Sequence, residues 1–149
     1  MIETVFSLSS LLVMPLWALM IFAPLWRVTK TIMQSPWVIA PAALLYAALI
    51  LPSLATVFPA VLNPSLNGIR MLLSTDSGAT IAWVHFLAFD LFVGRWAYLE
   101  SRALNLNVFA MAIVLLFTLM LGPVGALMYL GLRLMTRGTA LRAAISLEV

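Results

Sequence analysis

The sequence has no cysteine and only one histidine, His85, among its 149 residues. Without cysteine the chain can form no disulfide and no thiolate metal site, and it has no cysteine nucleophile. A single histidine excludes zinc and di-iron sites that draw several histidines from one chain. The sequence therefore predicts neither a metal site nor a cofactor.

Charged residues are also scarce, at 9% of the chain against about a quarter in an ordinary soluble domain. Hydrophobic residues make up 64%, and a soluble fold of this length could not cover that much apolar surface. The formal net charge is +3, and no basic run is present that would neutralise the phosphates of a nucleic acid. These properties predict an integral membrane protein whose partners are lipids and apolar ligands, and they exclude a nucleic-acid binder.

Four apolar segments are each close to the roughly 20 residues that a membrane-spanning helix needs. They cover residues 5–26, 36–58, 79–99 and 108–134. The sequence predicts an all-α membrane protein, a bundle of four transmembrane helices forming a single domain, residues 1–149.

Three of these segments contain an internal proline, namely Pro15, Pro52 and Pro123. Proline removes a backbone hydrogen bond and kinks a helix, so the bundle is predicted to have kinked helices. Membrane helices tolerate proline, and the alternative is that the kinks open a cavity beside the third helix.

The connection over residues 59–78 is long for a compact domain and is therefore a candidate functional loop. Residues 69–73 within it are expected to form a short helix at the membrane surface.

With four spans, each side of the membrane would hold four cationic residues, and the distribution of positive charge then gives no orientation. One side would hold Arg70, Arg133, Arg137 and Arg142, and the other Arg27, Lys30, Arg95 and Arg102.

The N-terminal segment differs from a cleaved signal peptide, because its only early charge is Glu3 and no small-residue cleavage pattern follows the apolar run. We expect it to be a retained membrane helix. No transit-type segment rich in arginine and serine precedes it, which favours a bacterial cytoplasmic membrane.

The third segment holds the most informative residue, Asp90, near its middle. A carboxylate at that depth costs roughly 2.5–3.5 kcal/mol on insertion scales, so intramembrane acids usually have a function. A structural alternative is that Asp90 caps a kinked helix or accepts a bond from a backbone donor. His85 and Arg95 lie five residues to either side, and five helical steps turn about 140°. Asp90 therefore points away from both and needs a partner on another helix, another subunit or a ligand.

Histidine suits proton transfer near neutral pH, so His85 is a candidate acid or base, or alternatively a polar contact between helices. Arg95 lies nearer the interface, where its side chain can extend to the headgroups. The aromatic side chains of this segment, among them Trp83, Phe86 and Tyr98, are candidates for a pigment cradle or for lipid-facing positions.

Taken together, these residues resemble the abscisic-acid-deficient-four-like proteins, which in plants are plastid membrane proteins required for neoxanthin synthesis. The resemblance covers most of residues 13–130. In the third segment it consists of Trp83-Val84-His85, Asp90-Leu91-Phe92, Arg95 and Tyr98. Elsewhere it includes Pro15, Leu19-Met20-Ile21, Ala23-Pro24, Thr29-Lys30, Ser35, Leu66, Gly68-Ile69, Ser74 and Pro123-Val124-Gly125.

The resemblance implies a membrane-embedded protein that acts on a carotenoid, as an intramolecular isomerase opening an epoxide by acid–base chemistry. Asp90 would donate a proton, His85 would accept one, and Arg95 would hold a ring oxygen or orient a carboxylate. The residues implied to bind the substrate are Trp83, Phe86, Tyr98 and Pro123. The alternatives are a carotenoid- or lipid-binding protein without catalysis, and a small proton-coupled transporter that would need a homo-oligomer.

Overall fold

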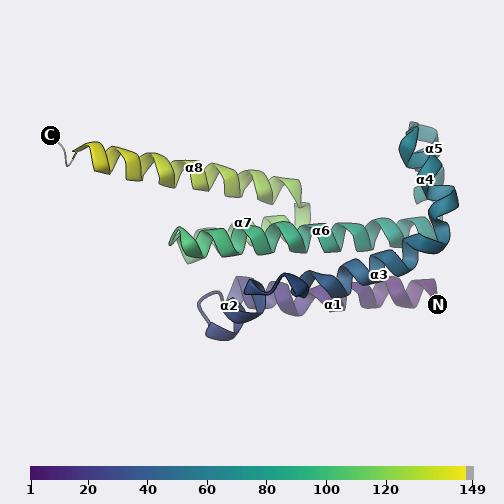
Figure 1. Cartoon of the computed structure of the whole chain (residues 1–149), viewed down its shortest axis with the longest axis horizontal. Helices are drawn as coiled ribbons and strands as arrows, with labels where there is room; N and C mark the ends of the chain where they lie inside the picture. Colours follow the sequence, from purple (N-terminus) through teal and green to yellow (C-terminus); the bar gives the residue numbers. More distant parts are fainter. Residues whose placement is uncertain (147–149) are drawn as a thin grey trace. The chain divides into compact units, whose positions relative to one another are not determined.

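The computed structural model describes the backbone of residues 1–146 and the side chains of residues 1–136, and every regular element in this part of the chain is a helix (Figure 1). This confirms the all-α class. The α-helices are α1 Ile2–Phe22, α2 Arg27–Gln34, α3 Ala40–Ile50, α4 Leu54–Leu62, α5 Leu66–Leu73, α6 Asp76–Ala103, α7 Val108–Leu121 and α8 Pro123–Ser146.

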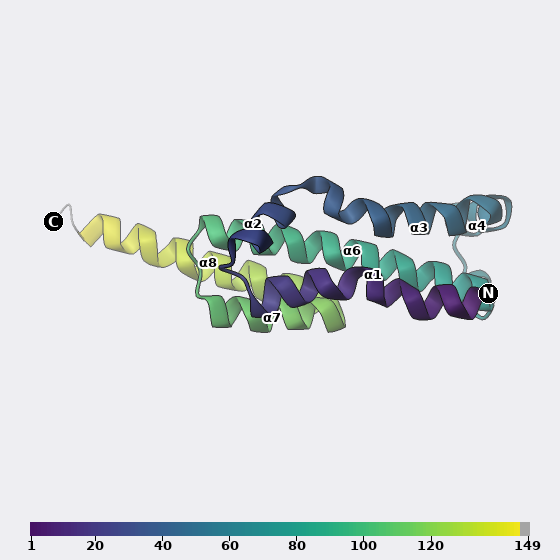
Figure 2. The same ribbon diagram turned by 90° about the horizontal axis from the view of Figure 1, so that it is seen from below.

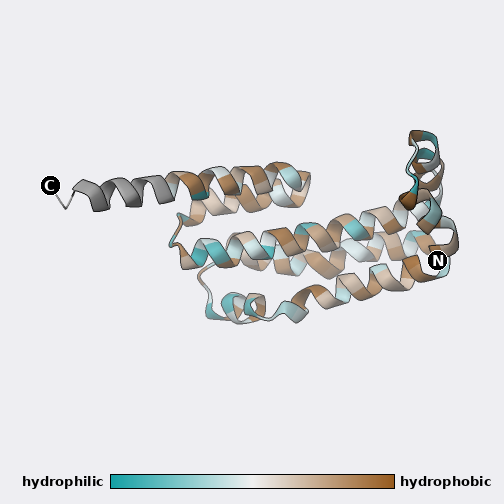
Figure 3. Ribbon diagram, turned by 45° about the horizontal axis from the view of Figure 1, so that its top comes forward, coloured by the Kyte–Doolittle hydropathy of each residue, from teal (hydrophilic) through white to brown (hydrophobic). Residues whose placement is uncertain are grey.

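Three helical stretches are long and apolar enough to cross a membrane, Ile2–Phe22, Pro36–Leu62 and Asp76–Ala103. The second consists of α3 and α4 with short 3-10 helices before and between them, and Pro52 lies in the second of these turns, Leu51–Ser53. Pro15, in contrast, lies inside α1 without ending it. Apolar residues dominate the long helices, whereas α2 is hydrophilic (Figure 3). The protein is thus a membrane protein with three candidate spans.

The predicted fourth span, residues 108–134, is wrong, because these residues form two helices instead of one kinked helix. Gly122 lies between them with a φ of 36°, in the left-handed region that glycine adopts most readily. Pro123 then occupies the first position of α8, where its missing N–H is not needed. The chain therefore reverses at this point, and α7 and α8 lie side by side (Figures 1 and 2). At 14 residues, α7 is about 21 Å long, shorter than the roughly 30 Å hydrocarbon core.

Two segments predicted as connections also contain helices. The short helix expected over residues 69–73 is confirmed as α5, which begins at Leu66 because the Ser65 hydroxyl accepts a hydrogen bond of 3.1 Å from the Gly68 N–H. The first connection, after α1, contains α2, which the sequence did not predict. Its residues Thr29 and Met33 are buried while most of its other side chains are exposed.

The chain forms two compact units, each discontinuous in sequence. The first contains residues 1–16 and 35–91, and the second contains residues 17–34 and 92–149. In the first unit α6 lies between α1 and α3 (Figure 2). The second contains α2, the last part of α6, and the α7–α8 pair. Because α1 and α6 each belong to both units, a single domain over residues 1–149 stays a prediction.

Candidate functional site

His85 lies in the first unit, on the side of α6 that faces α3. Its imidazole ring packs against two aromatic rings, with centroids 5.3 Å from Tyr46 and 4.8 Å from Phe89, and it is stacked on the Phe89 ring at an interplanar angle of 26°. In the part of the chain with described side chains, its ring nitrogens have no hydrogen-bond partner. The imidazole is thus fixed by aromatic packing while its nitrogens stay available to a ligand.

Next to His85 is a cavity of about 180 Å³, and a second cavity of about 440 Å³ adjoins it. The two share four lining residues, and we call them together the His85 groove. Of the described residues that line this groove, His85 is the one that can exchange a proton near neutral pH. The shared residues are Val57, Leu72, Gly78 and Ile81. The groove is therefore a mainly apolar site with one proton-transfer group in its wall.

Asp90 lies on a different face of α6, the face that packs against α1. Two neighbours on this face show the direction: the Trp83 indole N–H donates a 3.2 Å hydrogen bond to the Ser10 hydroxyl, and Gly94 lies directly against the Trp17 ring. A Cβ atom on Gly94 would overlap that ring, so the glycine makes room for this close neighbour.

The Asp90 carboxylate is half-buried, and no described residue forms a hydrogen bond or an ion pair with it. Asp90 is not among the residues that line the His85 groove. An acid without a bonded partner in the apolar middle of a span is costly, which is the situation that the sequence indicated.

Arg95 contacts a third helix, α2. Its Nε donates to the Met33 carbonyl at 2.7 Å and its Nη2 to the Gln34 carbonyl at 3.1 Å. These carbonyls lie at the end of α2, where a cation is favourable because of the helix dipole. Arg95 thus positions α2, and the structure does not bring His85, Asp90 and Arg95 together in one cluster.

The four residues implied to bind substrate lie in different surroundings. Phe86 lines the His85 groove, whereas Trp83 packs against α1. Tyr98 is buried, and its hydroxyl donates a 2.7 Å hydrogen bond to the Pro24 carbonyl, while Pro123 begins α8. Tyr46, which the sequence analysis missed, is at the groove, and a lone tyrosine in an apolar helix gave no signal for it.

No metal site is apparent where side chains are described, since no three or more histidine, aspartate or glutamate side chains lie close enough to hold an ion.

Comparison with known proteins shows that the chain matches one family model. The family model described as ABA DEFICIENT 4-like matches residues 4–129, which include His85, Asp90 and Arg95. The chain is also 32% identical over 102 residues to "Protein ABA DEFICIENT 4, chloroplastic" of Arabidopsis thaliana. This alignment covers 64% of the chain and 46% of the plant protein, so the chain spans about half the length of that relative. No solved structure matches the chain.

Proposed function

Since the chain belongs to the ABA DEFICIENT 4-like family, we propose that it acts on a carotenoid in the membrane, and that the His85 groove holds this ligand. The resemblance to plastid proteins required for neoxanthin synthesis supports the ligand class. The observation that carries the proposal is the groove itself, which combines an apolar wall with one imidazole whose nitrogens have no hydrogen bond to any described residue. Ligand sites typically combine an apolar lining with a few polar groups.

The finer proposal is an intramolecular isomerisation that opens an epoxide. The bond from the epoxide oxygen to the carbon next to the polyene breaks, and the oxygen takes up a proton and becomes a tertiary alcohol. The neighbouring vinylic carbon loses a proton, and an allene forms. One proton is taken up and one is released, so the step consumes no oxidant, reductant or water.

His85 is the group that we propose for both transfers. The epoxide oxygen and the vinylic hydrogen are only two carbons apart, so one imidazole can donate its proton to the first and accept the second. The negative charge of Asp90, five residues further along α6, would stabilise the imidazolium form. The pair expected from the sequence, with Asp90 as the acid, stays a prediction, as does the role of Arg95 in holding a ring oxygen.

The alternative function is carotenoid binding without catalysis. Two observations favour it: Asp90 does not line the groove, and the His85 ring packs against aromatic side chains as an ordinary core residue would. In that case the pigment would leave the protein unchanged.

Replacing His85 with phenylalanine separates the two functions. His85→Phe keeps a ring against Tyr46 and Phe89 but removes the nitrogens, so we expect pigment to co-purify while conversion falls by at least about 100-fold. The measurement is production in a carotenoid-producing host, visible absorbance of the purified protein, and chromatography of the extracted pigment. Trp37→Phe, at an exposed position, is the matched control and should convert normally.

Full conversion by His85→Phe would end the catalytic assignment. An unconverted pigment in both the original protein and the variant would establish binding without catalysis. Absence of both conversion in the host and pigment in the purified protein would contradict both functions.

A further inference from the structure

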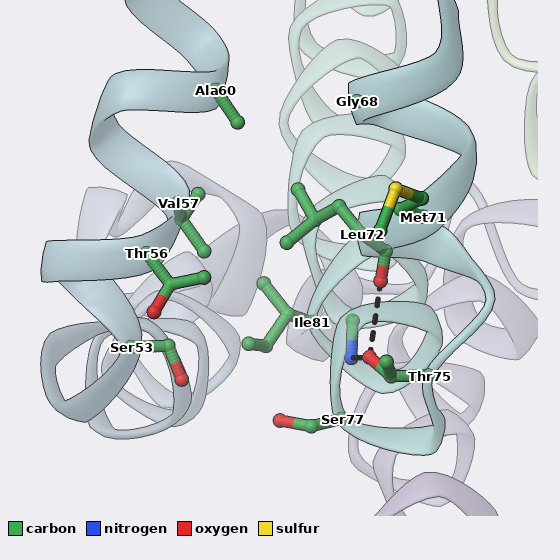
Figure 4. Close-up of a pocket in the computed structure, with 11 residues that line it drawn as sticks. Ser53, Thr56, Val57, Ala60, Gly68, Met71, Leu72, Thr75, Ser77 and Ile81 are labelled. Atoms are coloured by element: carbon green, nitrogen blue, oxygen red, sulfur yellow. Dashed lines mark hydrogen bonds between the residues drawn. The ribbon is translucent and has the colours of Figure 1, made fainter.

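The outer part of the His85 groove, the cavity of about 440 Å³, has a polar end (Figure 4). Ser53 and Thr56 approach it from the α4 side, and Ser77 points into it from the start of α6 (Figure 4). Ala60 and Gly68 lie at its other end. We call the three hydroxyl-bearing residues Ser53, Thr56 and Ser77 the hydroxyl cluster.

These three hydroxyls are available to a ligand. Within the described part of the chain none of them forms a hydrogen bond, whereas the neighbouring Thr75 hydroxyl donates to the Leu72 carbonyl and accepts from the Gly78 N–H, both at 3.0 Å. Thr56 and Ser77 are exposed and Ser53 is half-buried, so a ligand at this end of the cavity can reach their hydroxyls and form hydrogen bonds with them.

The cluster also lies at the appropriate depth for the polar end of a lipid-soluble molecule. Ser77 is the second residue of α6 and therefore near the membrane surface, while His85 lies eight residues deeper, about 12 Å along the helix axis. The wall between them is apolar and includes Val57, Leu72 and Ile81. A molecule with a hydroxyl at one end and a hydrocarbon chain behind it matches this order of polar and apolar surface.

We propose that the hydroxyl cluster is a specificity site that binds the hydroxylated end ring of a carotenoid, so that the polyene extends past His85. The inference rests on the proposed function, since it requires a carotenoid in the groove. It predicts that carotenoids with a hydroxyl on the end ring bind more tightly than hydrocarbon carotenoids of the same length.

The test compares zeaxanthin, which has one hydroxyl on each end ring, with β-carotene, which has none. The purified protein in nanodiscs is titrated with each, and quenching of its tryptophan fluorescence is recorded. We expect zeaxanthin to bind more tightly, and Thr56→Val to weaken only zeaxanthin, by about three- to tenfold for one hydrogen bond. Ser77→Ala should act in the same way, and Thr4→Val, an exposed threonine of the same unit outside the groove, should change neither affinity.

Equal binding of both carotenoids, unaffected by Thr56→Val and Ser77→Ala, would overturn the specificity site and leave the proposed function intact. Binding of neither carotenoid would overturn the proposed function itself.

A second inference, from different residues, concerns the orientation in the membrane. Arg133 Nη2 lies 2.6 Å from Glu100 Oε1, so α8 returns to the end of α6 where Arg102 is found. The even distribution of cations expected from the sequence assumed that residues 108–134 cross the membrane, and the reversal at Gly122 removes that crossing.

The cations are therefore concentrated on one side. Arg70, between the second and third spans, is at the opposite end of α6 from the others. The side where α1 and α6 end has Arg27, Lys30, Arg102 and Arg133. Short loops rich in lysine and arginine stay on the side from which the protein inserts. We infer that α2 faces this side and that the N-terminus and α5 face the other.

Absence of cysteine makes the test direct, because each single-cysteine variant has one thiol. In intact cells of a bacterial expression host, a membrane-impermeant maleimide should label Asn67→Cys in α5 and leave Gln34→Cys in α2 unlabelled until the inner membrane is opened. Both positions are exposed. The reverse pattern, or labelling of both in intact cells, would overturn this orientation.

Discussion

Replacing Asp90 with leucine is expected to stabilise the folded protein while abolishing the proposed conversion of the carotenoid, because an intramembrane carboxylate without a bonded partner is costly. The carboxylate lies in the apolar middle of α6 and has no hydrogen bond or ion pair with any described residue, so the fold gains nothing visible from it. Under the proposed function its charge would stabilise the imidazolium form of His85, five residues away on the same helix. The measurements are thermal unfolding followed by tryptophan fluorescence and chromatography of the pigment product.

Two further variants make this result interpretable. Asp90→Asn keeps the size and removes the charge, and it should lose conversion with a smaller change in stability. Asp76→Asn, at the first residue of α6, removes a carboxylate from the end of the same helix and should leave conversion unchanged. Lower stability of Asp90→Leu, with conversion retained, would show that Asp90 is a structural residue.

Replacing Gly125 with alanine is expected to destabilise the protein by about 1–3 kcal/mol, the usual cost of overpacking. A Cβ atom at this position would overlap the backbone nitrogen and side-chain oxygen of Thr118 on α7. Thr118 is fully buried, and its hydroxyl donates to the Val114 carbonyl at 2.8 Å, so it has little freedom to move. The two helices would have to separate, and the hairpin that begins at Gly122 would loosen.

Gly131 provides the matched control on the same helix. No atom lies within 4 Å of a Cβ placed there, so Gly131→Ala should raise stability by about 0.5–1 kcal/mol through its helix propensity alone. The opposite signs of the two changes, measured by thermal unfolding under the same conditions, are the result to look for. A stabilising Gly125→Ala would contradict the close packing of α7 on α8.

Several features of the fold and site were predictable because they depend on local sequence. Length and hydropathy predicted the helical membrane class. A short helix was also predicted over residues 69–73, where α5 lies. The membership of the ABA DEFICIENT 4-like family, expected from the residues around His85 and Asp90, is confirmed by the family match.

Other features depend on contacts between residues far apart in the sequence. Arg95 was expected near the headgroups, but its bonds to the Met33 and Gln34 carbonyls require α2, a helix whose polar sequence resembles a loop. The His85 groove likewise needs residues from α3, α4 and α5 beside α6, and no local pattern shows that they meet.

The sequence by itself determined that the protein lies in a lipid bilayer and that Asp90 is halfway along a span. Both follow from the order of apolar and charged residues along the chain. Only the tertiary structure decided whether residues 108–134 form one kinked helix or a helical hairpin, and which residues line the His85 groove. Gly122 and Pro123 are compatible with either a kink or a reversal, and packing of α8 on α7, with Gly125 against Thr118, selects the reversal. That selection depends on the free energy of contacts between helices, which the sequence of each helix alone does not contain.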